Sequence, residues 1–403
     1  MKILPSLSFI QDMAAEGTYD ILPVSCELLS DFITPIEALK ILKHVSSHCY
    51  LLESAAENET WGRYSFLGFD PKLEITCTNG LFKAGNLTVL TEDPSSLIRQ
   101  ILSEYKSPRF DYLPPFTGGL TGKLLETPVP AFDKTTFCAM IDEAKLRIWE
   151  GDIFQIVLSN CFSAPFEGSL FQTYRILRTL NPSPYMFYFS GTDLEIAGAS
   201  PETLVKLENG VVRTFPLAGT RPRGKNEAED KKLEAELLAD EKELAEHNML
   251  VDLGRNDLGK ISRFGTVQVE QFHSIQRFSH VMHIGSTVKG KLDSRYDALD
   301  AIEAVLPAGT LSGAPKIRAC QLINRLEQNK RGIYGGAIGY IDFTGNMDTC
   351  IAIRIAYKKN GRVFVRSGAG IVADSDPKKE YEECFNKARS SLNALELAQE
   401  DLL

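Results

Sequence analysis

The 403-residue sequence predicts an α/β (α+β) fold, in which antiparallel sheets and helices share one chain. Three observations support this prediction. Residues 1–110 contain short alternating polar and apolar stretches, such as Lys72–Cys77, which are typical of antiparallel strands. Residues 226–257 form a long tract of helical composition. The last third of the chain is a series of short strand patterns separated by turn residues.

Helices are expected before and after a segment rich in helix-breaking residues. Residues 35–47 have a helical pattern within the N-terminal region, and residues 112–122, rich in Pro and Gly, mark a boundary. Apolar residues at helical spacing then predict a helix over Thr135–Glu150, which Gly151 ends. The central helical tract is expected to break near Ala239.

The C-terminal third predicts a β meander followed by a last helix. Thr344–Asn346 is a turn sequence, and Asn360–Gly361 is typical of a type I′ hairpin turn. Asp376 and Pro377 supply an N-cap and a first helical residue for a helix that runs to about Ala398. The expected strands are Gly332–Phe343, Cys350–Lys358 and Arg362–Val372.

Composition excludes several classes of protein. The formal charge of −9 argues against nucleic-acid binding, which needs a basic surface. No apolar run reaches the length of a membrane span, and the N-terminus lacks the pattern of a secretion signal. We therefore expect a cytoplasmic protein. The eight cysteines have no zinc-site spacing and are expected to be reduced and mostly buried.

Two acidic doublets at i, i+3 spacing are the strongest chemical signal. Glu243 and Glu246 form one, Glu380 and Glu383 the other, and each lies near the start of an expected helix. This spacing puts both carboxylates on one helical face, so two facing doublets would suit a Mg²⁺ ion. A structural alternative stays open, because Glu243 can complete a capping box with Asp240.

Other polar positions have both a functional and a structural reading. Phe215–Gly224 reads as a strand ending in a Gly/Thr turn, which could bind an anion or be a plain loop. The glycines of Ser367–Ile371 allow a close ligand or a β-bulge. Strand alternation places Arg354 between two alanines, where it could bind a carboxylate or face solvent. His283 could transfer protons or be a core histidine, and Glu202 could be a general acid.

Together these segments resemble the chorismate-utilising enzyme family. The resemblance is continuous from about residue 152 and implies large antiparallel sheets packed as a sandwich around an active-site cleft, with helices outside. It also implies a catalytic region over residues 130–400, preceded by an N-terminal region, 1–110, with a tryptophan-binding-like segment. The segments that carry the resemblance are Pro216–Gly224, Ala245–Asp257, Pro307–Lys316 and Gly368–Ser375.

The resemblance implies a role for each matching residue. Glu246 and Glu383 would hold Mg²⁺, which takes the ring carboxylate of chorismate, and Glu243 and Glu380 would support them. Glu202 would protonate the departing C4 hydroxyl as ammonia attacks C2, and His283 and Thr310 would assist loss of pyruvate to give anthranilate. The residues implied to bind substrate are Gly219, Thr220, Tyr334, Arg354, Gly368, Ala369, Gly370 and Lys387.

Two neutral residues discriminate between branches of the family. Gln155 stands where water-using members carry a lysine base, and Ala218 stands where members that aminate C4 carry lysine. The resemblance therefore favours ammonia and C2, with a C4-aminating, aminodeoxychorismate-forming enzyme and a non-catalytic tryptophan-sensing subunit as alternatives. Ammonia would come from solution or from a separate glutamine amidotransferase subunit. The segment after Gly119 is shorter than is usual in the family.

A second group of residues resembles the family's tryptophan feedback site. These residues lie in two segments, Leu51–Ser54 with its continuation Arg63–Gly68, and Asn181–Met186. The resemblance implies that tryptophan inhibits the enzyme. The implied contacts are Ser54, Pro184, Tyr185 and Met186.

Overall fold

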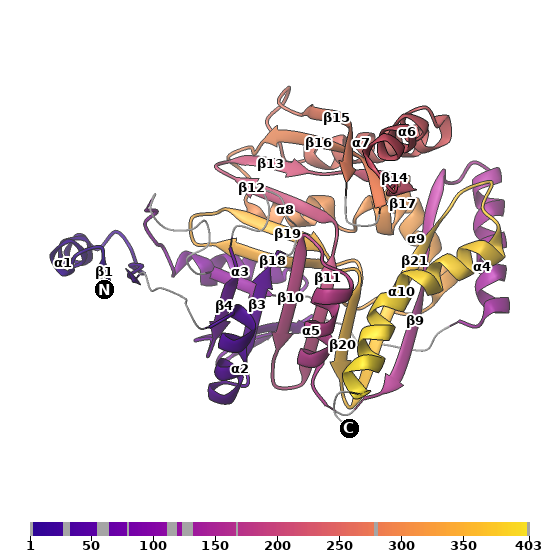
Figure 1. Cartoon of the computed structure of the whole chain (residues 1–403). Helices are drawn as coiled ribbons and strands as arrows, with labels where there is room; N and C mark the ends of the chain where they lie inside the picture. Colours follow the sequence, from indigo (N-terminus) through magenta and orange to yellow (C-terminus); the bar gives the residue numbers. More distant parts are fainter. Residues whose placement is uncertain are drawn as a thin grey trace.

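Two antiparallel sheets form the body of the protein (Figure 1). The computed structural model describes residues 3–26, 33–54, 64–78, 80–110, 119–122, 132–166, 168–277 and 281–400. In the order of their pairing, the first sheet contains β17 (Gly313–Ala314), β9 (Gln155–Pro165), β21 (Arg362–Ile371), β20 (Ile355–Lys359), β11 (Leu194–Ser200), β10 (Tyr185–Ser190), β3 (Cys49–Glu53) and β4 (Phe66–Phe69).

The second sheet is built mainly from the middle of the chain. Within the described residues, seven of its strands pair in one continuous order, and an eighth, β15, pairs only with β16, outside that order. In the order of their pairing, the other strands are β14 (Leu217–Pro222), β16 (Val281–Lys291), β13 (Val211–Thr214), β12 (Thr203–Glu208), β19 (Met347–Ile351), β18 (Ala337–Asp342) and β8 (Gly119–Gly122), and β15 spans Gln268–Arg277.

Three apolar clusters show that the two sheets are packed as a sandwich. Phe187 of β10 contacts a cluster that includes Ile338 of β18, so this cluster fills the space between the sheets. Its neighbours Met186 and Tyr188 belong to a second cluster on the other face of the first sheet. A third cluster lies on the outer face of the second sheet and includes Val251. The predicted sandwich is confirmed, and it follows from the period-2 alternation of each strand.

Helices cover the outer faces of both sheets. Figure 1 shows α5 and α10 running across the first sheet, where α10 packs on β21 and on α5. Helix α7 packs on β14 and β16 of the second sheet. The helices around the sandwich are α2 (Pro35–Val45), α4 (Lys134–Trp149), α5 (Leu170–Leu180), α6 (Glu227–Leu238), α7 (Glu241–Gly259), α8 (Ala298–Val305), α9 (Lys316–Glu327), α10 (Pro377–Glu400) and the 3-10 turn η1 (Gly309–Leu311).

The N-terminal region adds smaller elements. Its strands β3 and β4 extend the first sheet, and the division between residues 1–110 and 130–400 stays a prediction. The remaining elements are β1 (Ile3–Leu4), α1 (Leu7–Glu16), β2 (Ser25–Cys26), β5 (Ile75–Thr78), β6 (Leu81–Ala84), β7 (Leu87–Leu90) and α3 (Pro94–Ser103). In the part of the chain that the structure describes, no helix is long and apolar enough to cross a membrane. All eight cysteines lie in that part and are free thiols.

Local sequence chemistry fixes several element boundaries as expected. The central tract divides at Ala239, and Asp240 caps α7 by accepting hydrogen bonds from the backbone N–H groups of Lys242 and Glu243 at 3.1 and 3.2 Å. Asn360 and Gly361 have φ values of 50° and 70°, as a type I′ turn requires. These boundaries were predictable because each depends on residues adjacent in sequence.

Three strand predictions need correction. The expected strand Cys350–Lys358 is two strands in different sheets, because the chain leaves β19 at Ile351 and enters β20 at Ile355. Strand β14 contains the expected Gly/Thr turn as a β-bulge, at which Gly219 has a φ of 69°. The expected strand Gly332–Phe343 begins only at Ala337, after a turn.

Candidate functional site

Glu202 and Thr310 meet where the chain passes from β11 to β12. Glu202 lies in the short connection between these strands, and the hydroxyl of Thr310, in η1, donates a hydrogen bond of 2.9 Å to its Oε1 atom. Burial raises the pKa of Glu202 to about 7, although the Thr310 hydrogen bond and the charge of Lys387 act in the opposite direction. Glu202 can therefore carry a proton near neutral pH, as a general acid must.

A small cavity opens beside this pair. It has a volume of about 50 Å³, enough for one or two water-sized molecules, and both Glu202 and Thr310 contribute to its wall. On its other side it is lined by α7 residues, including Gly254 and Asp257.

The bulge in β14 brings a histidine to the same edge of the second sheet. His283, in β16, has its Nδ1 atom 2.9 Å from the carbonyl oxygen of Gly219 and 3.1 Å from the hydroxyl of Thr220. Because a carbonyl oxygen can only accept, Nδ1 carries the proton and Nε2 has the lone pair. Burial lowers the pKa of His283, and the charge of Arg354 lowers it further. The histidine is thus a neutral base.

Arg354 occupies the point where the chain changes sheets. It has a φ of 51°, so the strand alternation that predicted its orientation does not apply. The backbone here is held on both sides, because Ile351 N–H donates to the Glu202 carbonyl at 3.0 Å and Ala199 N–H donates to the Arg354 carbonyl at 3.1 Å. Burial lowers the pKa of Arg354, whereas Tyr334 acts in the opposite direction. A half-buried guanidinium of this kind gains from an anionic ligand.

The glycines of β21 bring the backbone close to Tyr334. The pairing of β21 with β9 has no register shift, so these glycines make no bulge. A Cβ atom on Gly368 would lie 2.9 Å from the Tyr334 hydroxyl, and one on Gly370 would lie 2.9 Å from Nε2 of Gln155. Ala369 is fully buried in a core cluster, so only its backbone can serve the site.

Gly368→Ala is expected to raise the KM for the substrate about tenfold or more, because the new methyl group would push Tyr334 out of place. Its Cβ would also lie 2.8 Å from the Leu158 carbonyl, so a loss of roughly 1–3 kcal/mol in stability is expected. Steady-state kinetics and thermal unfolding would measure both effects. Adding Tyr334→Phe should recover part of the stability, and a KM unchanged in Gly368→Ala would contradict the assignment.

The first acidic doublet lies at the start of α7. Glu246 accepts a hydrogen bond of 3.2 Å from Nε2 of Gln155, and burial together with the charge of Glu243 raises the pKa of Glu246. Glu243 lies 3.6 Å from Arg221, which pairs at 2.8 Å with the capping residue Asp240. Glu243 is thus in the first turn that Asp240 caps, while its carboxylate faces an arginine.

The second doublet lies at the start of α10. Burial, and then the charge of Glu383, raises the pKa of Glu380. Glu383 pairs with Lys387 at 2.6 Å. The charge of Lys387 also lowers the pKa values of Glu202 and Glu246, and that of Lys242 lowers the pKa of Glu380, so the starts of α7 and α10 interact electrostatically.

The chemistry of these oxygens fits a hard cation. Glu246 and Glu380, two half-buried carboxylates with raised pKa values, would be stabilised in their charged form by Mg²⁺. Oε1 of Gln155 is buried and has no hydrogen-bond partner within the described residues. Among those residues, no three His, Cys, Asp or Glu side chains lie close enough together to hold a metal ion. Convergence of the four carboxylates on one ion therefore stays a prediction.

The residues expected to contact tryptophan lie together at one end of the β3–β10 pair. Met186 pairs with Glu53, which places Ser54 next to Tyr185. The Met186 side chain is packed in the core, and Pro184 precedes the strand.

Sequence reasoning missed two polar partners of this group. The Tyr185 hydroxyl lies 2.9 Å from the hydroxyl of Thr203 and 2.8 Å from Asp348, a half-buried carboxylate in β19. Tyr185 is therefore hydrogen-bonded to the residue that follows Glu202. No local motif marks Thr203 or Asp348, because both are ordinary strand residues in sequence.

A family signature covers most of the chain. The sequence signature of the chorismate binding enzymes matches residues 62–393. The chain belongs to this family, which is confirmed as predicted.

Similar proteins narrow the assignment to one branch. The chain is 38% identical to anthranilate synthase component 1 of Acetivibrio thermocellus, covering 98% of this chain and 99% of that protein. It is 41% identical to anthranilate synthase component 1 of Methanothermobacter thermautotrophicus, covering 91% and 93%. Within the family, the chain therefore groups with the anthranilate synthase component 1 proteins and is an enzyme of the kind that acts on chorismate.

A solved structure supports the same grouping. Anthranilate synthase component I from Streptococcus pneumoniae is 34% identical, with a TM-score of 0.72, covering 91% of this chain and 99% of that chain. The menaquinone-specific isochorismate synthase of Escherichia coli is 24% identical, with a TM-score of 0.61, covering 92% and 85%, which shows a shared fold.

Proposed function

We propose that this protein aminates chorismate at C2 with ammonia and then eliminates pyruvate, giving anthranilate in a Mg²⁺-dependent lyase reaction. The single observation that carries the proposal is the state of Glu202. Burial raises its pKa to about 7, and its carboxyl group accepts a hydrogen bond from the Thr310 hydroxyl. A proton donor of this strength suits the departing C4 hydroxyl, which leaves more readily as water than as hydroxide.

The other side chains bind the two carboxylates of the substrate. Arg354, half-buried and depressed in pKa, would pair with the enolpyruvyl carboxylate beside Tyr334 and the Gly368–Gly370 backbone. Glu246 and Glu383 would hold Mg²⁺, with Glu243 and Glu380 in support. When bound, the ion would draw electron density from the ring carboxylate as the hydroxyl leaves.

A neutral histidine suits the second half of the reaction. Loss of pyruvate removes the C2 proton, and Nε2 of His283 has the lone pair to accept it. Thr310 would assist from η1, and Gly219 and Thr220 would line the site. The positive charge of Lys387 would offset the negative charge of the carboxylates near Glu202, consistent with its lowering of the pKa of Glu202.

Ammonia is the nucleophile that Gln155 favours. A buried amide beside Glu246 cannot deprotonate water as a lysine base would, whereas ammonia needs no activation. We infer that a glutamine amidotransferase subunit supplies the ammonia. We also propose that tryptophan inhibits the enzyme by binding at Ser54 and residues 184–186.

A direct assay tests the proposal. With chorismate, Mg²⁺ and an ammonium salt, we expect fluorescent anthranilate and one equivalent of pyruvate, and less of both when tryptophan is added. Leaving out Mg²⁺ is the control. A non-aromatic aminated product without pyruvate would instead indicate a C4-aminating enzyme, and tryptophan binding without any turnover would indicate a sensing subunit.

A further inference from the structure

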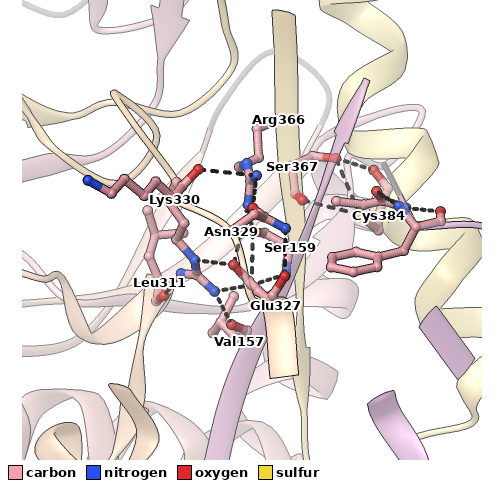
Figure 2. A network of polar contacts seen from close by, with 12 residues as sticks. Val157, Ser159, Leu311, Glu327, Asn329, Lys330, Arg366, Ser367 and Cys384 are labelled. Atoms are coloured by element: carbon pink, nitrogen blue, oxygen red, sulfur yellow. Dashed lines mark hydrogen bonds and ion pairs between the residues drawn. The ribbon is translucent and has the colours of Figure 1, made fainter. Parts of the chain in front are cut away.

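A buried ionic network lies behind the candidate site (Figure 2). Its centre is Glu327, the last residue of α9, which is 1% exposed. The Glu327 carboxylate accepts hydrogen bonds from Arg331 at 2.5 and 2.9 Å, from Arg366 at 3.3 Å, and from the backbone and hydroxyl of Ser159 at 2.8 and 3.0 Å. A carboxylate buried this deeply needs such partners.

Arg331 also donates hydrogen bonds to two backbone carbonyls. Its Nη1 atom donates to Leu311 at 2.5 Å, and its Nη2 atom donates to Val157 at 2.7 Å. Leu311 is the residue after Thr310 in η1, and Val157 pairs with Gly370 across β9 and β21. One guanidinium thus fixes the backbone that carries Thr310 and the backbone that faces Gly370.

The backbone of Arg331 reaches a third segment. Its carbonyl oxygen accepts a hydrogen bond of 3.3 Å from the N–H of Tyr334, in the turn that follows. Lysine could not replace the side-chain contacts of Arg331 with Glu327 and the two backbone carbonyls, because it presents one nitrogen where the planar guanidinium presents several in fixed directions.

Arg366 is a natural comparison. It contacts the same Glu327, and its other hydrogen bonds go to the Ser159 hydroxyl, to the Asn329 side chain and to the Lys330 carbonyl (Figure 2). Both arginines therefore stabilise the buried carboxylate, while Arg331 in addition donates to the η1 turn.

We propose that Arg331, oriented by Glu327, is a positioning residue that sets the η1 turn so that Thr310 can hydrogen-bond to Glu202. This inference rests on the proposed function, in which Glu202 is the proton donor. Arg331 would touch neither chorismate nor the reacting atoms, and would act through Thr310.

The test compares Arg331→Lys with Arg366→Lys in the full-length chain. Anthranilate formation is measured as a function of pH, together with thermal unfolding. Arg331→Lys is expected to lower kcat about 10- to 100-fold and to move the alkaline limb of the pH profile upward. The direction follows because the Thr310 hydrogen bond holds the pKa of Glu202 down, so its loss lets that pKa rise. Arg366→Lys should lower the unfolding temperature with the alkaline limb unmoved.

Thr310→Val supplies a second arm. It removes the hydrogen bond directly and should give the same upward shift, and adding Arg331→Lys to it should move the limb no further. If Arg331→Lys does not fold, Glu327→Gln decides the question, because it keeps an acceptor for Arg331 but weakens its hold, and a smaller shift in the same direction is expected.

Three results would overturn the proposal. The first is an active wild-type protein together with a folded Arg331→Lys variant whose alkaline limb has not moved. Where Arg331→Lys does not fold, an unmoved limb in Glu327→Gln counts in the same way. Either result would refute the role of Arg331 and leave the proposed function standing. An equal shift in Arg366→Lys would show that the network acts on stability in general. No anthranilate from the wild-type protein would refute the proposed function, and the role of Arg331 with it.

Discussion

Glu202→Gln is expected to lower kcat by about a hundredfold to ten-thousandfold, the usual contribution of a general acid. Glutamine can still accept the hydrogen bond from Thr310, but it cannot give a proton to the departing hydroxyl. Because the pKa of Glu202 is about 7, wild-type kcat should fall as pH rises through that value, and the residual activity of the variant should lack this limb.

Although Glu202→Gln lowers kcat, it should increase the stability of the folded protein at alkaline pH. The folded pKa of Glu202 is raised, so the folded state loses stability as pH rises from about 4.5 to about 7 and the buried carboxyl ionises. At pH 8, Glu202→Gln should therefore be more stable than wild type by roughly 2 kcal/mol, since one pKa unit corresponds to about 1.4 kcal/mol and Glu202 is not fully buried. Chemical denaturation at pH 5 and pH 8 measures this. A kcat of Glu202→Gln equal to that of the wild-type protein would refute the assignment of Glu202 as the general acid.

Glu246→Gln is expected to abolish Mg²⁺-dependent activity, with a loss greater than about a hundredfold, since even outer partners of a metal site contribute 10- to 100-fold. In the wild-type protein, Mg²⁺ at a hundred times its Kd should add about 2.7 kcal/mol of stability. The variant should show no such gain. Turnover assays and thermal unfolding, each with and without Mg²⁺, measure the two effects.

Metal-free Glu246→Gln should be at least as stable as the wild-type protein. Burial and the charge of Glu243 disfavour the ionised form of Glu246, and a neutral amide removes that cost. Glu241→Gln is the matched control, because Glu241 is an exposed acid in the first turn of the same helix. An undiminished Mg²⁺ response in Glu246→Gln would show that the ion binds elsewhere.

Much of the fold was predictable where short-range chemistry decides it. Asp240, the Asn360–Gly361 turn and the Asp376 cap each act on residues within a few positions, and the structure has them as expected. The strand Cys350–Lys358 was wrong for the opposite reason. Isoleucine continues at every second position through the junction, at 351, 353 and 355, and no local signal marks the change of sheet around Arg354.

The site was predictable to a different degree. The sequence alone indicated the glutamate doublets as a possible Mg²⁺ site and Glu202 as a possible general acid, and the detailed roles proposed for them came from family resemblance. The Glu327–Arg331 pair could not be recognised, because i, i+4 spacing normally indicates a solvated ion pair on a helix surface. Its burial depends on Ser159 and Arg366, which are distant in sequence.

The change of sheet between Ile351 and Ile355 limits how the length of this chain can vary. Surface turns such as that at Asn360 can accept an extra residue at little cost. An insertion or deletion within residues 352–354 would instead shift β19 against one sheet or β20 against the other, exchanging inward and outward side chains along a whole strand. It would also change where Arg354 lies relative to Ile351, whose N–H donates a hydrogen bond to the Glu202 carbonyl. Changes in length among relatives should therefore be found elsewhere in the chain.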